Sequence, residues 1–268
     1  AESAESESID IETVKQILLG TACKTYDYII IDEAQDIADK GIMPFIDKLC
    51  SKTGNGLSIG SYLIFYDLEQ GYNSSYRHIE DVVSDLLSHA VHYQLNENKR
   101  VITNKEIVRT ANQILTIDSN DGYSEFMKTL CLNEQPYLHV VKADINKEFS
   151  RAFRNAIKQT TDVTNSVVLA HSSLKHLISK NDAGMSVFDS LQCKAGVHCL
   201  DENDIYNPDR SSIPFTSILK YKGLETHKVI LILPNRCTVS DFKNFIYEVY
   251  VGFTRAMMEL HVIIYNVQ

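Results

Sequence analysis

A short apolar run that ends in a carboxylate cluster limits this chain to a small set of folds. Residues 26–36 read Tyr-Asp-Tyr-Ile-Ile-Ile-Asp-Glu-Ala-Gln-Asp. The continuous run from Tyr28 to Ile31 is typical of a parallel strand covered on both faces, which occurs in α/β proteins. Asp32 and Glu33 then emerge at the carboxyl end of the strand, the edge where parallel sheets place their chemistry.

These two carboxylates suit a magnesium-dependent site. An Asp at a strand tip can hold Mg²⁺ through water or hydroxyl ligands, and an adjacent Glu left free of the metal can polarise an attacking water. We therefore assign Asp32 to the metal and Glu33 to the role of general base. The alternative interpretation is an acidic loop after a core strand, since a bare Asp-Glu pair is not specific.

The longer string Asp-Glu-Ala-Gln-Asp resembles the second motif of the UvrD/Rep-like superfamily 1 helicases. Residues 63–72, Leu-Ile-Phe-Tyr-Asp-Leu-Glu-Gln-Gly-Tyr, are similar to the third motif of that family. The resemblance implies that Gln70 senses the γ-phosphate of ATP, and that Gln35 and Asp67 belong to the same nucleotide site.

The fourth and fifth motifs follow in the family's order. Residues 95–100, Leu-Asn-Glu-Asn-Lys-Arg, resemble the fourth motif, which assigns Arg100 to a phosphate contact. Residues 217–225, Ser-Ile-Leu-Lys-Tyr-Lys-Gly-Leu-Glu, resemble the fifth motif, which faces both nucleotide and nucleic acid. The resemblance places Gly223 and Glu225 on the nucleotide side.

The sixth motif is matched by residues 250–256, Tyr-Val-Gly-Phe-Thr-Arg-Ala. In the family its Arg reaches the triphosphate from the second RecA-like domain, so Arg255 is the candidate arginine finger. A guanidinium suits this task because it stays charged and offers a planar fork of donors to phosphate oxygens. Together the five motifs cover residues from about 20 to 265 in the order of the family.

The chain also departs from the family pattern. It contains no Gly-x-x-x-x-Gly-Lys-Ser/Thr phosphate loop, and the nearest string, at 20–25, lacks the second glycine. Lys99 replaces the Tyr that stacks on adenine, Leu219 replaces a His, and Tyr66 replaces a Gly. We expect either the carboxy-terminal part of a longer helicase, inactive alone, or a natural short protein that has lost hydrolysis.

The nucleic-acid side is less clearly marked. A formal net charge of −9 is unusual for a protein that grips a polyanion. A few local cations and aromatic platforms can still hold a single strand. The candidates are Ser217, Lys220 and Lys222 in the fifth motif and Tyr72 after the third, although ordinary partial burial is the favoured interpretation of the tyrosine.

Composition indicates a globular cytoplasmic protein rather than a membrane or secreted one. Hydrophobic residues make up 44% of the 268-residue chain, and no apolar run reaches membrane-spanning length. The six cysteines lack Cys-x-x-Cys spacing, which argues against a zinc ribbon or a disulfide framework. We therefore predict reduced thiols and no structural metal.

The hydrophobic pattern predicts alternating strands and helices, and hence parallel sheets with helices on both faces. We place the first, incomplete RecA-like domain at 1–94 and the second at 95–268, with loops at 118–123 and 201–210. The predicted strands are 27–32, 61–66, 90–95, 137–142, 166–170, 197–200, 214–218, 228–233 and 259–265. The predicted helices are 10–19, 40–50, 77–89, 103–116, 147–159, 173–180 and 239–254.

These observations predict the carboxy-terminal part of an ATP-dependent DNA helicase or translocase. By resemblance, ATP and Mg²⁺ are its cofactors, hydrolysis between two RecA-like domains drives movement along single-stranded DNA, and a protein partner recruits it. The competing hypothesis is a non-catalytic helicase-like module that binds nucleic acid or a partner protein without turning over ATP.

Overall fold

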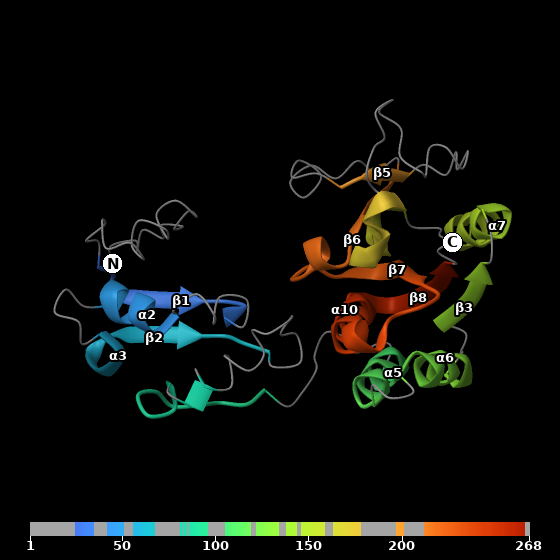
Figure 1. Ribbon diagram of the computed structural model, residues 1–268. Helices are drawn as coiled ribbons and strands as arrows, with labels where there is room; N and C mark the ends of the chain where they lie inside the picture. Colours follow the sequence, from blue (N-terminus) through green and yellow to red (C-terminus); the bar gives the residue numbers. More distant parts are fainter. Residues whose placement is uncertain are drawn as a thin grey trace. The chain divides into compact units, whose positions relative to one another are not determined.

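The computed structural model divides the chain into two compact units, Ala1–Gln94 and Leu95–Gln268 (Figure 1). Four of the predicted site residues, Gln35, Gln70, Tyr72 and Arg100, lie outside the described residues, as do the predicted helix at 10–19 and the predicted loop at 201–210. The described residues are 25–34, 42–50, 56–67, 81, 83–84, 86–95, 105–118, 122–133, 138–143, 146–158, 163–177, 197–200 and 212–265.

The first unit contains two parallel strands, β1 (Tyr28–Ile31) and β2 (Ser61–Ile64), with helices α2 (Ile42–Cys50) and α3 (Gly56–Ile59). Ile29 and Ile31 are buried, but Ile30 is 63% exposed and Tyr28 54% exposed. The prediction that this run is covered on both faces is therefore wrong for the described residues. The reason is that the apolar core, which includes Ile46 and Leu49 of α2, packs against only one face of β1.

The second unit is built on a six-stranded sheet in which every neighbouring pair of strands is parallel. The strand order is β3-β8-β7-β4-β6-β5. This arrangement confirms the predicted α/β class. The strands are β3 (Leu138–Ala143), β4 (Ser166–Ala170), β5 (Val197–Cys199), β6 (Ile213–Ser217), β7 (Thr226–Pro234) and β8 (Ala256–Tyr265).

Helices cover both faces of this sheet (Figure 1). The α-helices are α5 (Lys105–Leu115), α6 (Gly122–Leu132), α7 (Asn146–Lys158) and α10 (Phe242–Phe253). The 3-10 helices are η4 (Val163–Asn165), η5 (Ser172–Leu177), η6 (Leu219–Tyr221) and η7 (Val239–Asp241).

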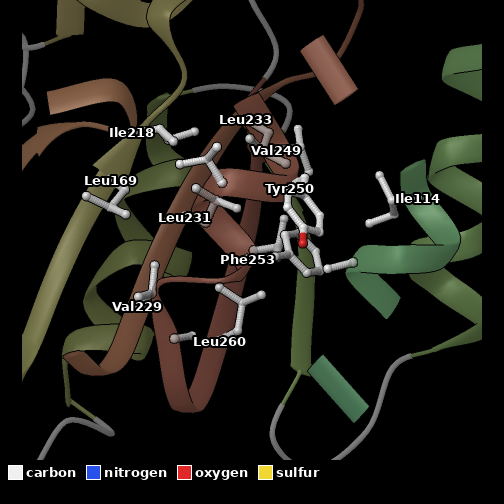
Figure 2. Packing of buried hydrophobic residues seen from close by; sticks show 14 of the residues in the cluster. Ile114, Leu169, Ile218, Val229, Leu231, Leu233, Val249, Tyr250, Phe253 and Leu260 are labelled. Atoms are coloured by element: carbon white, nitrogen blue, oxygen red, sulfur yellow. The ribbon is translucent and has the colours of Figure 1, made fainter. Parts of the chain in front are cut away.

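Successive residues of the central strands point to opposite faces and supply two separate cores. Val229, Leu231 and Leu233 pack with α5, α6 and α10, whereas Ile230 and Ile232 pack with α7. Figure 2 shows the larger core, in which Leu231 and Leu233 of β7 lie against Val249 and Phe253 of α10. Strands that are apolar at every position are therefore explained by helices on both sides.

Three secondary-structure predictions differ from the structure. Residues 90–95 do not form a strand; Val91, Tyr93 and Leu95 are at least 79% exposed, and no described strand pairs with them. Residues 172–177 form a 3-10 helix interrupted at Leu174 instead of an α-helix. No described helix combines the length and the apolar composition needed to cross a bilayer.

The third difference is the loop predicted at 118–123, which is wrong at its last two residues because α6 begins at Gly122. This glycine packs against the ring of Phe242, where a Cβ atom would lie 2.5 Å from the ring. Gly122, Phe126 and Leu130 are buried at helical spacing along α6. The sequence prediction assigned Gly122 to a loop, but this glycine serves a close contact of α6 with Phe242.

Candidate functional site

The predicted magnesium residues lie where the two strands of the first unit end. Because β1 and β2 are parallel and Ile31 is paired with Ile64, the residues that follow each strand share one edge. The pairing continues past the strands, since Phe65 N donates to Ile31 O at 2.8 Å and Ala34 N donates to Phe65 O at 3.0 Å. Asp32 and Asp67 therefore follow neighbouring strand ends at this edge.

Glu33 has an unusual backbone conformation. Its φ is +53°, in the left-handed region that non-glycine residues rarely adopt. Its N–H donates to Asp32 Oδ1 at 2.9 Å, so the two carboxylate residues are tied together locally. Rare backbone conformations cost free energy and cluster at functional sites, which is consistent with a positioned base.

One departure from the family has a partner inside the same unit. Tyr66, which stands where the family has Gly, places its hydroxyl 2.8 Å from His92 Nε2. The two rings are stacked with centroids 6.1 Å apart. The tyrosine therefore attaches the segment after β2 to the segment around His92.

The fifth-motif segment, residues 218–225, crosses the sheet of the second unit. It runs from the carboxyl ends of the parallel strands, the carboxyl edge, to their amino ends, the amino edge. Ser217 ends β6 beside Ala170 of β4, and Ala170 is level with Ile232 of β7. The segment then enters β7 at Thr226, which is level with Ala256. Six residues separate Thr226 from Ile232, or about 20 Å along a strand. Residues 218–225 thus connect opposite edges of the sheet.

The residues predicted to contact nucleic acid begin at the carboxyl edge. Ser217 is the last residue of β6, and its Oγ accepts a hydrogen bond of 3.4 Å from the backbone N–H of Lys220. Lys220 is exposed and Lys222 is partly exposed. This end of the segment therefore combines the Ser217 hydroxyl with the cationic side chain of Lys220, and Lys222 follows further along the segment.

The residues predicted to contact the nucleotide end at the amino edge. Gly223 has a φ of +86°, which glycine adopts without strain, and an added Cβ would meet nothing within 4 Å. Glu225 is exposed and directly precedes β7. Thr226 N donates to Arg255 O at 3.0 Å, so the fifth and sixth motifs meet at this edge.

The guanidinium of Arg255 is buried, and the residue is only 1% exposed. Its Nε donates to Val251 O at 3.1 Å, Nη1 to Leu224 O at 3.2 Å and Nη2 to Thr254 Oγ1 at 2.9 Å. These bonds tie the end of α10 to the fifth-motif segment. To reach a phosphate, the side chain would have to exchange some of them.

Sequence reasoning missed a buried polar cluster at the carboxyl edge. Glu248 of α10 is 1% exposed and accepts hydrogen bonds of 2.6 Å from both the N–H and the Oγ of Ser172. His171 directly follows β4, and its Nδ1 lies 2.9 Å from Ser173 Oγ. The available signal was the string His-Ser-Ser after the wholly buried strand β4.

His171 is held as a neutral imidazole. Burial lowers its pKa to about 4, although the Glu248 carboxylate, 3.3 Å from Nε2, favours the protonated form. The distance to the carboxylate is short, but Nε2 lacks the alignment of a hydrogen bond. Desolvation is therefore the larger effect, and Ser172 supplies the hydrogen bonds that satisfy Glu248.

Comparison with known proteins adds little to this geometry. No protein-family model matches the sequence, and a search of curated proteins finds no match. One similar solved structure is the C-terminal domain of a possible DNA helicase from Lactobacillus plantarum WCFS1, at a TM-score of 0.42 and 14% identity. The match covers 60% of this chain and 85% of that one. A similarity of this size does not assign a function to this chain.

Proposed function

We propose that this chain is the carboxy-terminal part of an ATP-dependent DNA helicase or translocase. The observation that carries the proposal is the path of residues 218–225 across the second sheet. It separates Ser217 and Lys220 at the carboxyl edge from Glu225 at the amino edge. One continuous segment can thereby respond to a nucleotide at one edge and to a nucleic acid at the other.

In this proposal the first unit supplies the magnesium and water-activating groups. Asp32 is an exposed carboxylate at a strand end, and carboxylate oxygens with water are the ligands that Mg²⁺ prefers. Glu33 orients and deprotonates the attacking water, while Gln35, Asp67 and Gln70 line the nucleotide. ATP bound with Mg²⁺ supplies the phosphoryl group.

The second unit stabilises the transferred phosphoryl group and binds the strand. Arg100 and Arg255 offer guanidinium donors to the charge that builds on the phosphate oxygens, and Gly223 and Glu225 contact the nucleotide. Ser217 and Lys220, at the carboxyl edge, and Lys222, further along the same segment, contact the phosphates of single-stranded DNA. Tyr72 stacks on a base. A protein partner would recruit the enzyme to its DNA.

A non-catalytic module is the second candidate function, and one observation favours it. The Arg255 guanidinium is buried in hydrogen bonds to its own unit, as expected for a residue whose work is structural. In that case the carboxyl edge would bind nucleic acid or a protein without ATP turnover. The two functions differ in whether Glu33 is needed for any reaction.

The experiment that separates them is single-strand-stimulated ATP hydrolysis. It compares the 268-residue chain with a version extended upstream to the native start codon, and with Glu33→Gln in the extended version. We expect hydrolysis by the extended protein, its loss in Glu33→Gln by at least about a hundredfold, and retained ATP binding. Glu125→Gln, an exposed change on α6, is the control. Unchanged hydrolysis in Glu33→Gln would overturn the base assignment.

A further inference from the structure

Three potential metal ligands converge on the sheet face that α7 covers. Leu138 and Leu260 point into the α10-side core, so their neighbours His139, Glu259 and His261 point to the opposite face. His139 and His261 are directly paired across β3 and β8. One ligand atom from each of the three side chains lies within 4.8 Å of the others.

Both imidazoles direct the same nitrogen at one carboxylate oxygen. His261 Nε2 lies 2.5 Å from Glu259 Oε1, and His139 Nε2 lies 3.8 Å from the same atom. The two rings are stacked, with centroids 4.5 Å apart and planes 23° apart. The strand pairing therefore holds both rings in nearly parallel planes with their Nε2 atoms beside the carboxylate.

These distances fit the coordination sphere of zinc. Zinc binds His nitrogen and carboxylate oxygen at about 2.0–2.2 Å in tetrahedral sites, which places neighbouring ligand atoms about 3.4 Å apart. The 3.8 Å separation is close to this value. The 2.5 Å separation is that of a hydrogen bond, so zinc binding would release the proton shared by His261 Nε2 and Glu259 Oε1 and move the two atoms apart.

Lys228 is the group that opposes a metal at this position. It lies level with Glu259 on the neighbouring strand, and its Nζ is 3.3 Å from Glu259 Oε1. Its side chain is 7% exposed, so the ammonium is held close to the carboxylate. A divalent cation would meet the repulsion of this charge and share Glu259 with it.

We propose that His139, Glu259 and His261 form a Zn²⁺ site that attaches strand β3 to strand β8, with Lys228 limiting its affinity. Three protein ligands leave the fourth tetrahedral position to a water molecule. His139 is the second residue of β3, which occupies one end of the sheet order, so the metal holds the amino end of that strand in register. The site contrasts with the sequence prediction of no structural metal.

The test is zinc binding by the full 268-residue chain, measured in competition with a chromophoric chelator, followed by Co²⁺ substitution. Because the chain has nine histidines and six cysteines, the comparison between variants identifies the site. We expect His139→Ala to bind one equivalent less than the native chain and to lose the visible absorption of tetrahedral cobalt. The matched control is His227→Ala, an exposed histidine next to Lys228, which should retain both.

Lys228→Met supplies an independent measurement, since it removes the competing charge and retains three candidate ligands. We expect its zinc affinity to rise by about tenfold. Equal zinc stoichiometry and equal affinity in the native chain and His139→Ala would overturn the site. An affinity that does not rise in Lys228→Met would place any bound metal away from Glu259 and also contradict the proposal.

Discussion

Arg255 shows how far a single residue can be interpreted from sequence. The Thr-Arg-Ala string places an arginine directly before a strand, and the structure places its backbone carbonyl at the amino edge, where it accepts a hydrogen bond from Thr226 N. Sequence could not reveal that the guanidinium is buried, because Leu224 O, one of its acceptors, lies 31 residues away. The buried position of Glu248 could not be predicted for the same reason, since its partner Ser172 is 76 residues away.

Arg255→Lys tests whether this residue is structural, catalytic or both. Lysine keeps the charge but cannot make the three hydrogen bonds of the guanidinium, so the unfolding free energy should fall by about 1–3 kcal/mol. Hydrolysis by the extended protein should also fall strongly because the phosphate loses a planar fork of donors. Denaturant unfolding and ATPase assays measure the two effects separately.

The control for this change is Arg109→Lys, in which the exposed α5 arginine pairs with Glu106 on the same helix. Exposed helix pairs contribute little, so its stability should shift by less than about 0.5 kcal/mol. If folded Arg255→Lys hydrolyses ATP at the native rate, Arg255 does not act on the nucleotide and its role is structural.

At the scale of elements, α10 links the two edges of the second sheet. Glu248 holds the segment after β4 near the carboxyl edge, and Arg255 follows the helix at the amino edge. Seven residues separate them, or about 10 Å along a helix. Long apolar strands such as β7 could be predicted from the hydrophobic pattern of the sequence. The helix α6 could not, since a glycine used for packing resembles one used for a turn.

Glu248→Gln tests this attachment. The native carboxylate accepts two hydrogen bonds of 2.6 Å from Ser172 while fully buried, and an amide would turn one acceptor into a donor. We expect a loss of about 1–3 kcal/mol of unfolding free energy, measured as a lower urea midpoint. Glu125→Gln, an exposed change on α6, should leave the midpoint nearly unchanged. A native midpoint in Glu248→Gln would mean that the contact does not anchor the loop.

At the scale of the whole molecule, the sheet of the second unit has two edges to which we assign different ligands. The α/β class and the parallel direction of the strands follow from apolar runs that alternate with helical patterns. The predicted strand at 90–95 failed because an alternating pattern cannot show whether a partner strand is present. The register of β4, β6 and β7, which separates the edges by about 20 Å, could be obtained only from the structure.

Separate functions of the two edges are tested most directly by measuring the affinities of the extended protein for nucleotide and for single-stranded DNA, each alone, in two variants. Lys220→Ala should weaken DNA binding, reduce its salt dependence by about one counterion and leave nucleotide affinity unchanged. Glu225→Ala should weaken nucleotide binding and leave DNA affinity unchanged. If both variants weaken the binding of the same ligand, or if neither variant changes the affinity for nucleotide or DNA, the two edges do not have separate functions.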